Sequence, residues 1–173
     1  MFRFALAFVI LSAGYAQAQQ DADSPMTLRR MAEIVFTLDA DAENNGPAFR
    51  FVIDDTVVVL VTDEAADRMR AMVPIRSAND LSPTDLRRMM QANFDAALDA
   101  RYAIADGQLW SVFIHPFRAL EKDQLISGLA QTVNAAKTYG GLYTGGAQQF
   151  GQGDSAPLQR QLIDELLKRG EEI

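Results

Sequence analysis

The period of the hydrophobic pattern changes repeatedly along the chain, as in proteins that combine helices and strands. Apolar residues at spacings of three and four predict helices over 25–38, 82–98, 120–139 and 155–169. Apolar runs and alternations predict strands over 49–53, 56–61, 69–75, 102–105 and 108–114. We therefore predict an α+β fold: an antiparallel sheet with helices on one face, in the order α-β-β-β-α-β-β-α, followed by a C-terminal amphipathic helix.

Short polar turns join four of these strands into two hairpins. Asp54-Asp55 separates the first pair, and Asp106-Gly107 separates the last pair, where Asp-Gly favours a two-residue type I′ turn. Pro74 indicates that the third strand lies at an edge or ends there, because proline cannot donate a ladder hydrogen bond. The last strand is predicted to be central in the sheet, which implies a buried Trp110.

Capping residues mark the start of the first two predicted helices. Ser24-Pro25 is predicted to begin the first helix, and Ser82-Pro83-Thr84-Asp85 is close to a capping box. The second helix carries an apolar face that is expected to cover the sheet, made of Leu86, Met90, Phe94, Ala97 and Leu98.

Residues 1–18 have the three parts of a secretory signal peptide. Arg3 precedes an apolar run, and Ala16-Gln17-Ala18 is a small-residue cleavage pattern, which predicts cleavage between Ala18 and Gln19. A membrane anchor is disfavoured, because the run from 4 to 15 holds 12 residues and a helix needs about 20 to cross a bilayer. We expect a periplasmic or secreted bacterial protein with no stable membrane anchor after processing.

Composition excludes several kinds of chemistry. The chain has no cysteine and one histidine, which rules out disulfides, thiolate metal sites and any metal site with two histidines from one chain. Its 16 basic and 23 acidic residues give a net charge of −7, which argues against nucleic acid as a partner, since nucleic-acid recognition needs a basic face. No cofactor is expected.

The lone histidine is the main candidate for catalysis. His115 ends the last predicted strand, and Ser111 lies four residues earlier on the same predicted face. A catalytic base needs a nucleophile beside it, and the sequence has no Gly-x-Ser-x-Gly elbow. A structural role at the strand end is favoured, with a periplasmic hydrolase or metal-dependent enzyme centred on His115 as the alternative.

Two loops match ligand-binding motifs only in part. The acidic loop 39–46 has Asn44 and Arg50 where an EF-hand needs glycine and glutamate, so a solvated loop is favoured over weak calcium binding. The glycine-rich stretch 140–146 follows a helix and holds no lysine, so it is expected to end that helix and not to cradle a phosphate.

The chain divides into four predicted parts: a signal peptide at 1–18, a single α+β domain at 19–140, a flexible linker at 141–154 and a C-terminal helix with its tail at 155–173. The last helix has an apolar stripe of Leu158, Leu162 and Leu166. A helix of about 14 residues is marginal alone in water, so this stripe must find a surface. That surface belongs to its own domain, a second subunit or a partner, and the stripe is a candidate partner-binding site.

The element order resembles the type III secretion chaperone-like fold, a group that includes the YbjN-type proteins. The local match is residues 101–143, where Asp106-Gly107, Leu109-Trp110 and His115-Pro116 precede a helix that ends at Tyr139-Gly140-Gly141. The overall resemblance covers about residues 25–143. It implies a sheet with helices on one face, often dimeric, that binds other polypeptides without enzymatic activity.

These features together predict an exported, non-enzymatic, chaperone-like domain that binds a protein or peptide. Secretion chaperones are cytoplasmic, so the signal peptide makes this chain an exported variant, and its client is not identified by the resemblance. Binding is expected at an exposed sheet face or groove, helped by the tail helix, and a homodimer is compatible with the resemblance. Arg87-Arg88 is expected to lie on a solvated helix face, with recognition of an acidic partner segment as the alternative.

The signal-peptide prediction is tested by expressing the full chain in a bacterial host. We expect a soluble periplasmic protein that begins at Gln19, because the apolar run is too short to anchor it. Intact-mass measurement of the periplasmic extract checks the cleavage site. A full-length chain recovered from the membrane fraction would contradict the prediction of soluble export.

Overall fold

The computed structural model describes residues 25–95, 99–139 and 157–171. The predicted signal peptide 1–18, its cleavage site at Ala18 and Gln19, and the predicted linker 141–154 lie outside these residues. None of the helices in the described ranges is long and apolar enough to cross a membrane. The elements are α2 (Leu28–Leu38), β1 (Glu43–Asn45), β2 (Ala48–Ile53), β3 (Thr56–Asp63), β4 (Arg68–Ser77), the 3-10 turn η1 (Ala78–Asp80), α3 (Pro83–Asp95), β5 (Arg101–Ala105), β6 (Gln108–His115), α4 (Lys122–Lys137) and α5 (Pro157–Gly170).

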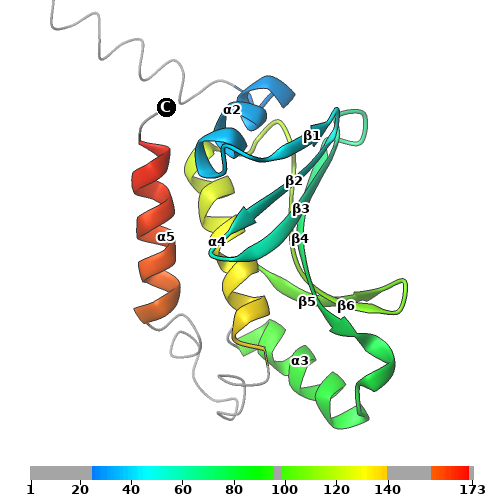
Figure 1. The fold of residues 1–173 in the computed structure, drawn as a ribbon. Helices are drawn as coiled ribbons and strands as arrows, with labels where there is room; N and C mark the ends of the chain where they lie inside the picture. The colour runs from blue at the N-terminus through cyan, green and yellow to red at the C-terminus, as the bar shows by residue number, and fades with distance from the viewer. Residues whose placement is uncertain (1–24, 96–98, 140–156, 172–173) are drawn as a thin grey trace, which may run out of the picture.

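The six strands form one antiparallel sheet in the order β1-β2-β3-β4-β6-β5. α2 and α4 pack on one face of this sheet, and α5 lies outside α4 as a further layer (Figure 1). α3 lies at the β5 end of the sheet (Figure 1). The predicted α+β class, with its antiparallel sheet and C-terminal helix, is therefore confirmed.

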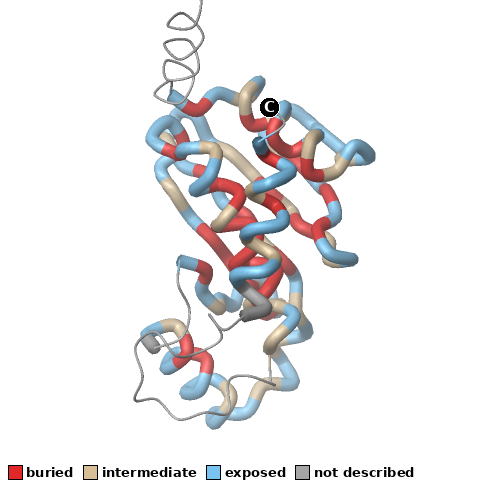
Figure 2. Tube along the Cα trace, turned by 90° about the vertical axis from the view of Figure 1, so that its left-hand side faces the viewer, coloured by how far each residue is buried: buried red, intermediate tan, exposed pale blue. Residues whose placement is uncertain are grey.

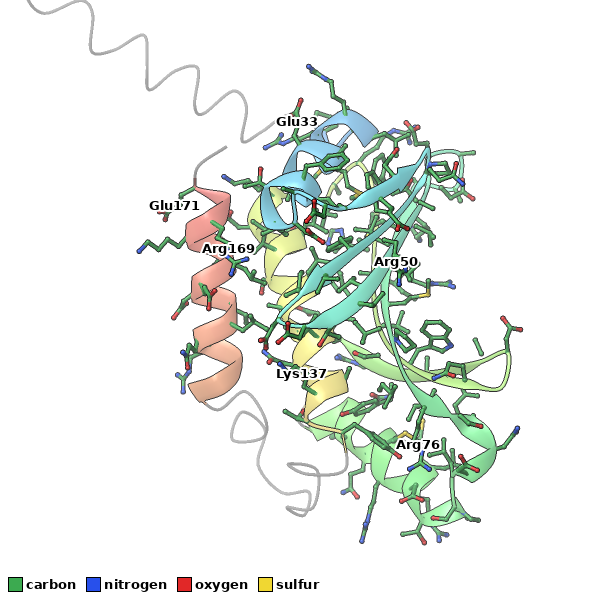
Figure 3. The ribbon with its side chains drawn as sticks, in the orientation of Figure 1. Glu33, Arg50, Arg76, Lys137, Arg169 and Glu171 are labelled. Carbon is green, nitrogen blue, oxygen red and sulfur yellow. The ribbon has the colours of Figure 1, made fainter. Side chains whose placement is uncertain are left out.

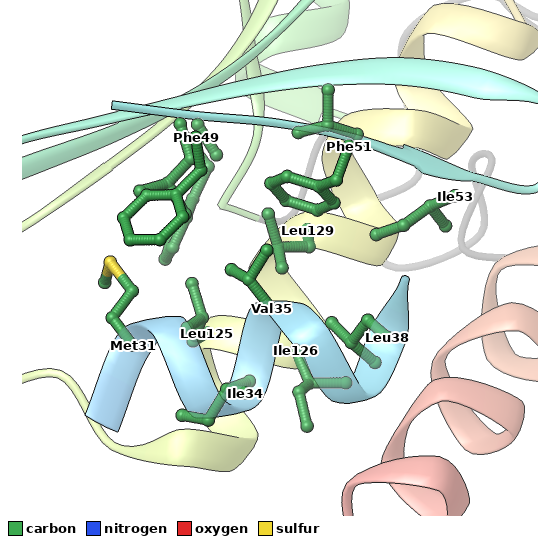
Figure 4. Close-up of a cluster of buried hydrophobic side chains, with 14 of the residues drawn as sticks. Met31, Ile34, Val35, Leu38, Phe49, Phe51, Ile53, Leu125, Ile126 and Leu129 are labelled. Carbon is green, nitrogen blue, oxygen red and sulfur yellow. The ribbon is translucent and has the colours of Figure 1, made fainter. Parts of the chain in front are cut away.

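The core lies between the sheet and the two inner helices. β2 turns Phe49, Phe51 and Ile53 toward the helices, while Arg50 and Val52 are exposed on the other face. This alternation follows from the two-residue period of a strand. Figure 4 shows the three β2 side chains facing buried side chains of α2 and α4, namely Met31, Ile34, Val35, Leu38, Leu125, Ile126 and Leu129.

α4 is buried on more than one side. Nine of its 16 residues are buried. Gly128 lies so close to β6 that a Cβ atom there would overlap the ring of Phe113. A residue without a side chain is therefore needed where this helix crosses the sheet. The buried stretches of the chain lie together in the middle of the molecule (Figure 2).

Both predicted hairpin turns are confirmed. Asp54 and Asp55 have φ values of 47° and 57°, and Asp106 and Gly107 have φ values of 51° and 72°. Positive φ at both central residues is what a type I′ turn requires. The carboxylate of Asp54 also forms an ion pair with Lys137 of α4, which connects the hairpin turn to the helix layer. Figure 3 labels Lys137 on α4.

The first helix begins later than predicted. Its N-cap is Thr27, whose side chain accepts a hydrogen bond from the Arg30 N–H at 3.2 Å. Ser24 lies outside the described residues, and the prediction that Pro25 starts the helix is wrong. The reason is tertiary, because Met26 is buried and its N–H donates to the carbonyl of Arg118 at 3.0 Å.

The predicted acidic loop 39–46 contains a short edge strand. β1 pairs with β2 only as far as Arg50, and beyond it the Val52 N–H donates to Asp39 Oδ2 at 2.8 Å. Asp39 Oδ1 accepts from the Asp41 N–H at 3.0 Å. The hydrophobic pattern could not predict β1, because Glu43, Asn44 and Asn45 are polar on both faces.

β4 is an interior strand, so the prediction drawn from Pro74 is wrong. β4 lies between β3 and β6, and its pairing with β6 shifts register between Pro74 and Arg76. An irregularity of this kind leaves one residue outside the ladder. It therefore tolerates a proline inside a sheet, where the missing N–H would otherwise interrupt the pairing.

Trp110 is only partly buried, so its predicted burial is also wrong. β6 turns Leu109, Ser111 and Phe113 toward the helices, and Trp110 lies on the opposite face. Its Nε1 donates to the Ala105 carbonyl at 3.3 Å. Both faces of β6 are largely apolar, so the sequence does not show which face meets the helices.

The two aromatic positions are expected to differ in their cost to stability. Phe51→Ala should lower the free energy of unfolding by about 3–5 kcal/mol, because it empties a fully buried site. Trp110→Ala should cost clearly less, because part of that side chain already contacts water. Urea denaturation of the two variants measures both values, and an equal loss would contradict the assignment of Trp110 to the uncovered face.

Candidate functional site

The start of α3 is fixed by a capping box, as predicted. The Asp85 N–H donates to Ser82 Oγ at 3.2 Å, and Asp85 Oδ2 accepts from Ser82 Oγ at 2.6 Å and from the Ser82 N–H at 3.0 Å. These bonds from Ser82 hold the pKa of Asp85 below its usual value, because they stabilise the charged carboxylate. The first turn of α3 is thus anchored by residues of α3 and its cap alone.

Asn93 attaches the other end of α3 to the edge strand β5. The Tyr102 N–H donates to Asn93 Oδ1 at 2.7 Å, and Asn93 Nδ2 donates to the Tyr102 carbonyl at 3.1 Å. The Asn93 side chain therefore takes the place that a neighbouring strand would have at Tyr102. Sequence analysis missed this residue, because an asparagine within a helix carries no pattern that marks such a contact.

The segment before β5 is held from the α4 side. The Asp99 N–H donates to Gln131 Oε1 at 2.7 Å, and Gln131 is buried within α4. The hydroxyl of Tyr102 donates to the Ala135 carbonyl of α4 at 2.8 Å. β5 is therefore fixed to α3 at its edge and to α4 on its helix-facing side.

The predicted apolar face of α3 is largely exposed. Leu86 is 40% exposed, Met90 69% and Phe94 72%. α3 instead buries Met89 and Ala92, the neighbouring face of the helix. The expectation that this stripe covers the sheet is wrong for these three residues, and Ala97 and Leu98 lie outside the described residues.

An apolar groove runs between α3 and β5. It encloses about 220 Å³. Ile104 of β5 lies at this groove and is 49% exposed. We name Leu86, Met90, Phe94 and Ile104 the α3–β5 surface; the groove itself is lined by Leu86, Met89, Met90, Asn93, Tyr102, Ala103, Ile104 and Leu109.

Ile104 also presents unused backbone groups. The two-residue turn makes Ala105 and Gln108 a hydrogen-bonded pair, so alternation turns the N–H and C=O of Ile104 away from β6. β5 is the last strand of the sheet, and within the described residues these two groups have no hydrogen-bond partner. A backbone of this kind is able to pair with another extended chain.

The arginine pair of α3 lies exposed on the same helix. Arg87 and Arg88 are both exposed, beside the stripe of Leu86 and Met90. Arg76, also exposed, forms an ion pair with Asp80 at 3.6 Å. The surroundings of the α3–β5 surface therefore include positive charge, although the whole chain is acidic.

His115 lines a second, more polar cavity of about 580 Å³. Its Nδ1 lies 2.9 Å from the Pro116 carbonyl oxygen. Ser111 is buried and does not line the cavity. Ser127 lines the cavity, and its hydroxyl accepts a hydrogen bond from Gln131 Nε2 at 3.1 Å. Among the described residues, no hydrogen bond joins Ser127 to His115. The cavity is lined by Asp99, Arg101, Phe113, Ile114, His115, Asp123, Gln124, Ser127 and Leu167.

Two findings about the described residues bear on the enzyme alternative. A serine nucleophile would have to be hydrogen-bonded to His115, and among the described residues neither Ser111 nor Ser127 has such a bond. In the described ranges, no group of three or more histidine, aspartate and glutamate side chains is placed to hold a metal ion. The carboxylate of Asp39, in the predicted acidic loop, is already bonded to two backbone N–H groups.

The stripe of the last helix packs against its own domain. Leu166 is 1% exposed within the core, and Leu162 is partly buried against it. Leu158 belongs to α5, but its side chain lies outside the described part of the structure. Leu162 and Leu166 are therefore not an open surface while α5 stays docked.

Comparison with known proteins shows a similarity of structure. No protein-family model matches the sequence, and no curated protein matches it. A chain of the HopA1–SchA chaperone–effector complex is 14% identical, with 56% of this chain and 77% of that chain covered and a TM-score of 0.46. The Yersinia pestis type III secretion chaperone SycH, in complex with a stable fragment of YscM2, is 19% identical, with coverage of 61% and 98% and a TM-score of 0.45. The predicted resemblance to type III secretion chaperones is thus confirmed as structural similarity.

Proposed function

We propose that this chain is an exported, non-enzymatic protein that binds a segment of another polypeptide at the α3–β5 surface. The observation that carries this proposal is the exposed stripe of Leu86 and Met90 beside the apolar groove. Soluble monomeric proteins rarely expose large contiguous apolar patches, and such patches commonly mark interaction sites.

The geometry favours an extended segment as the bound form. Its backbone pairs with the free N–H and C=O of Ile104, as in recognition by strand addition. Alternate side chains of such a strand point to one face, so an apolar side chain of the segment enters the groove between Met90 and Ile104. Acidic residues flanking it are attracted by Arg87 and Arg88.

Export is part of the same proposal. It rests on Arg3, the apolar run 4–15 and the pattern Ala16-Gln17-Ala18. A periplasmic or secreted binding protein works without the ATP supply of the cytoplasm. Its affinity for a client must therefore come from contacts alone, and a groove beside an unpaired strand edge supplies such contacts passively.

The binding proposal is tested with the mature chain and insulin as a model client. Dithiothreitol reduces insulin and its B chain aggregates, whereas this chain has no cysteine to react. We expect an equimolar amount of the mature chain to slow the rise in light scattering. Leu86→Glu combined with Met90→Glu should remove most of this protection, because two charges then lie in the apolar stripe.

A matched control carries the same charge change on the same helix. Thr84→Glu combined with Gln91→Glu alters two exposed positions and should protect as well as the wild type. Equal protection by both double variants would exclude the α3–β5 surface. A wild-type dimer that Leu86→Glu/Met90→Glu turns into a monomer, measured by sedimentation, would assign this surface to a second copy of the chain and overturn the proposal of a foreign client.

A further inference from the structure

α5 lies on the domain as a separate outer helix (Figure 1). It buries Leu166 and partly buries Leu162, Ile163 and Leu167 against α4 and α2. Its opposite face carries exposed polar residues, including Glu165 and Arg169, which form an ion pair at 2.6 Å. α5 is thus an amphipathic helix bound to a helical surface, on elements other than those of the α3–β5 surface.

Two contacts fix where α5 ends. Gly170 packs so closely on α4 that a Cβ atom there would overlap Cδ1 of Ile126. Lys122, at the start of α4, donates from Nζ to the Gly170 carbonyl at 2.8 Å. A cation at a helix C-terminus is favourable, because it meets the negative end of the helix dipole. The surface therefore recognises the apolar stripe, the small residue and the C-terminal end of a helix.

α5 adds little to the core that it covers. The main cluster of buried side chains among the described residues has 22 members, and only Leu166 comes from α5. The other members come from the sheet, α2, α4 and the adjoining loops. The contacts between the sheet and the inner helices therefore do not depend on α5.

The fit of α5 is also incomplete. Leu167 borders the cavity of about 580 Å³ that extends to α4 and β6. This cavity is open to solvent. Leu167 therefore lies beside open space, where a partner helix with a larger side chain at this position has room for more contacts.

The connection to α4 allows α5 to leave the surface while the chain stays intact. Residues 140–156 include six glycines. Seventeen residues reach on the order of 50 Å when extended, which far exceeds what detachment requires. A tethered helix competes at an effective concentration of about millimolar, which a tightly binding partner overcomes.

We propose that the surface of α2 and α4 beneath α5 is a helix-binding site, and that α5 is its intramolecular ligand. The partner that replaces it is an amphipathic helix of another protein. Its apolar residues match the spacing of Leu162, Ile163, Leu166 and Leu167, and a small residue follows three positions later. Its C-terminal end lies at Lys122, as that of α5 does.

The first experiment detaches α5 in the mature full-length chain. Leu166→Glu places a charge at a buried position and should expose the site. Hydrogen exchange is expected to show loss of protection in α5 with protection retained in α2, α4 and the sheet. Gln161→Glu makes the same charge change on the exposed face of α5 and should leave its protection unchanged.

The second experiment offers the ligand in trans. A fluorescent peptide of residues 157–171 should bind the Leu166→Glu chain roughly tenfold or more tightly than the wild type, whose own α5 competes from the same chain. Lys122→Gln added to Leu166→Glu should weaken this binding about two- to fivefold. The same peptide carrying Leu166→Glu should not bind.

Three results would overturn the helix-binding site. The first is global unfolding of the Leu166→Glu chain, which would make α5 an integral part of the core. The second is equal peptide affinity for Leu166→Glu and wild type. The third is a wild-type dimer that becomes monomeric with Leu166→Glu, because α5 would then join two copies. Leu86→Glu/Met90→Glu should bind the peptide as the wild type does, which separates this site from the α3–β5 surface.

Discussion

The close approach of α4 to the sheet at Gly128 and Phe113 is the contact on which the other layers depend. Because Gly128 has no side chain, the helix axis comes close to β6 and its buried residues reach both the sheet and the outer helix. A larger residue at 128 would push α4 away from β6 and open the cluster formed by Phe51, Leu125 and Leu129. α4 is buried on its outer side as well, where α5 packs against it.

The two edges of the sheet differ in how far their backbone groups are blocked from pairing with another strand. At the β1 edge, the strand is short and polar, Glu43 pairs with Arg50 at 3.7 Å, and the Val52 N–H is taken by the Asp39 carboxylate. At the β5 edge, Asn93 takes the backbone groups of Tyr102, but those of Ile104 stay open beside apolar side chains. Proteins commonly block strand edges against unwanted pairing. An edge that is blocked at one residue and open at the next is suited to selective pairing with a partner.

The sequence predicted the elements well where local chemistry determines them, and poorly where tertiary contacts do. Asp54-Asp55 and Asp106-Gly107 determine their turns within two residues, and Ser82 with Asp85 determines a helix start within four. The start of α2 depends instead on a hydrogen bond between Met26 and the distant Arg118. β4 lies inside the sheet although it contains Pro74, and its pairing with β6 shifts register directly after that residue. The hydrophobic periodicity of the sequence predicts neither the start of α2 nor the position of β4 in the sheet.

The helical stripes of α3 and α5 also show that the sequence pattern does not predict tertiary contacts. α3 and α5 both have apolar stripes at four-residue spacing, Leu86 to Phe94 in one and Leu162 to Leu166 in the other. The pattern alone predicts that each stripe packs. α5 has the outer side of α4 to cover, whereas the main contact of α3 with the sheet is the short edge strand β5. α3 buries Met89 and Ala92, and the side chains of its main stripe stay exposed to different extents. We infer that the area of the facing surface decides whether such a stripe packs or stays exposed. For α3 this area is small, because β5 is short and α3 lies at the end of the sheet.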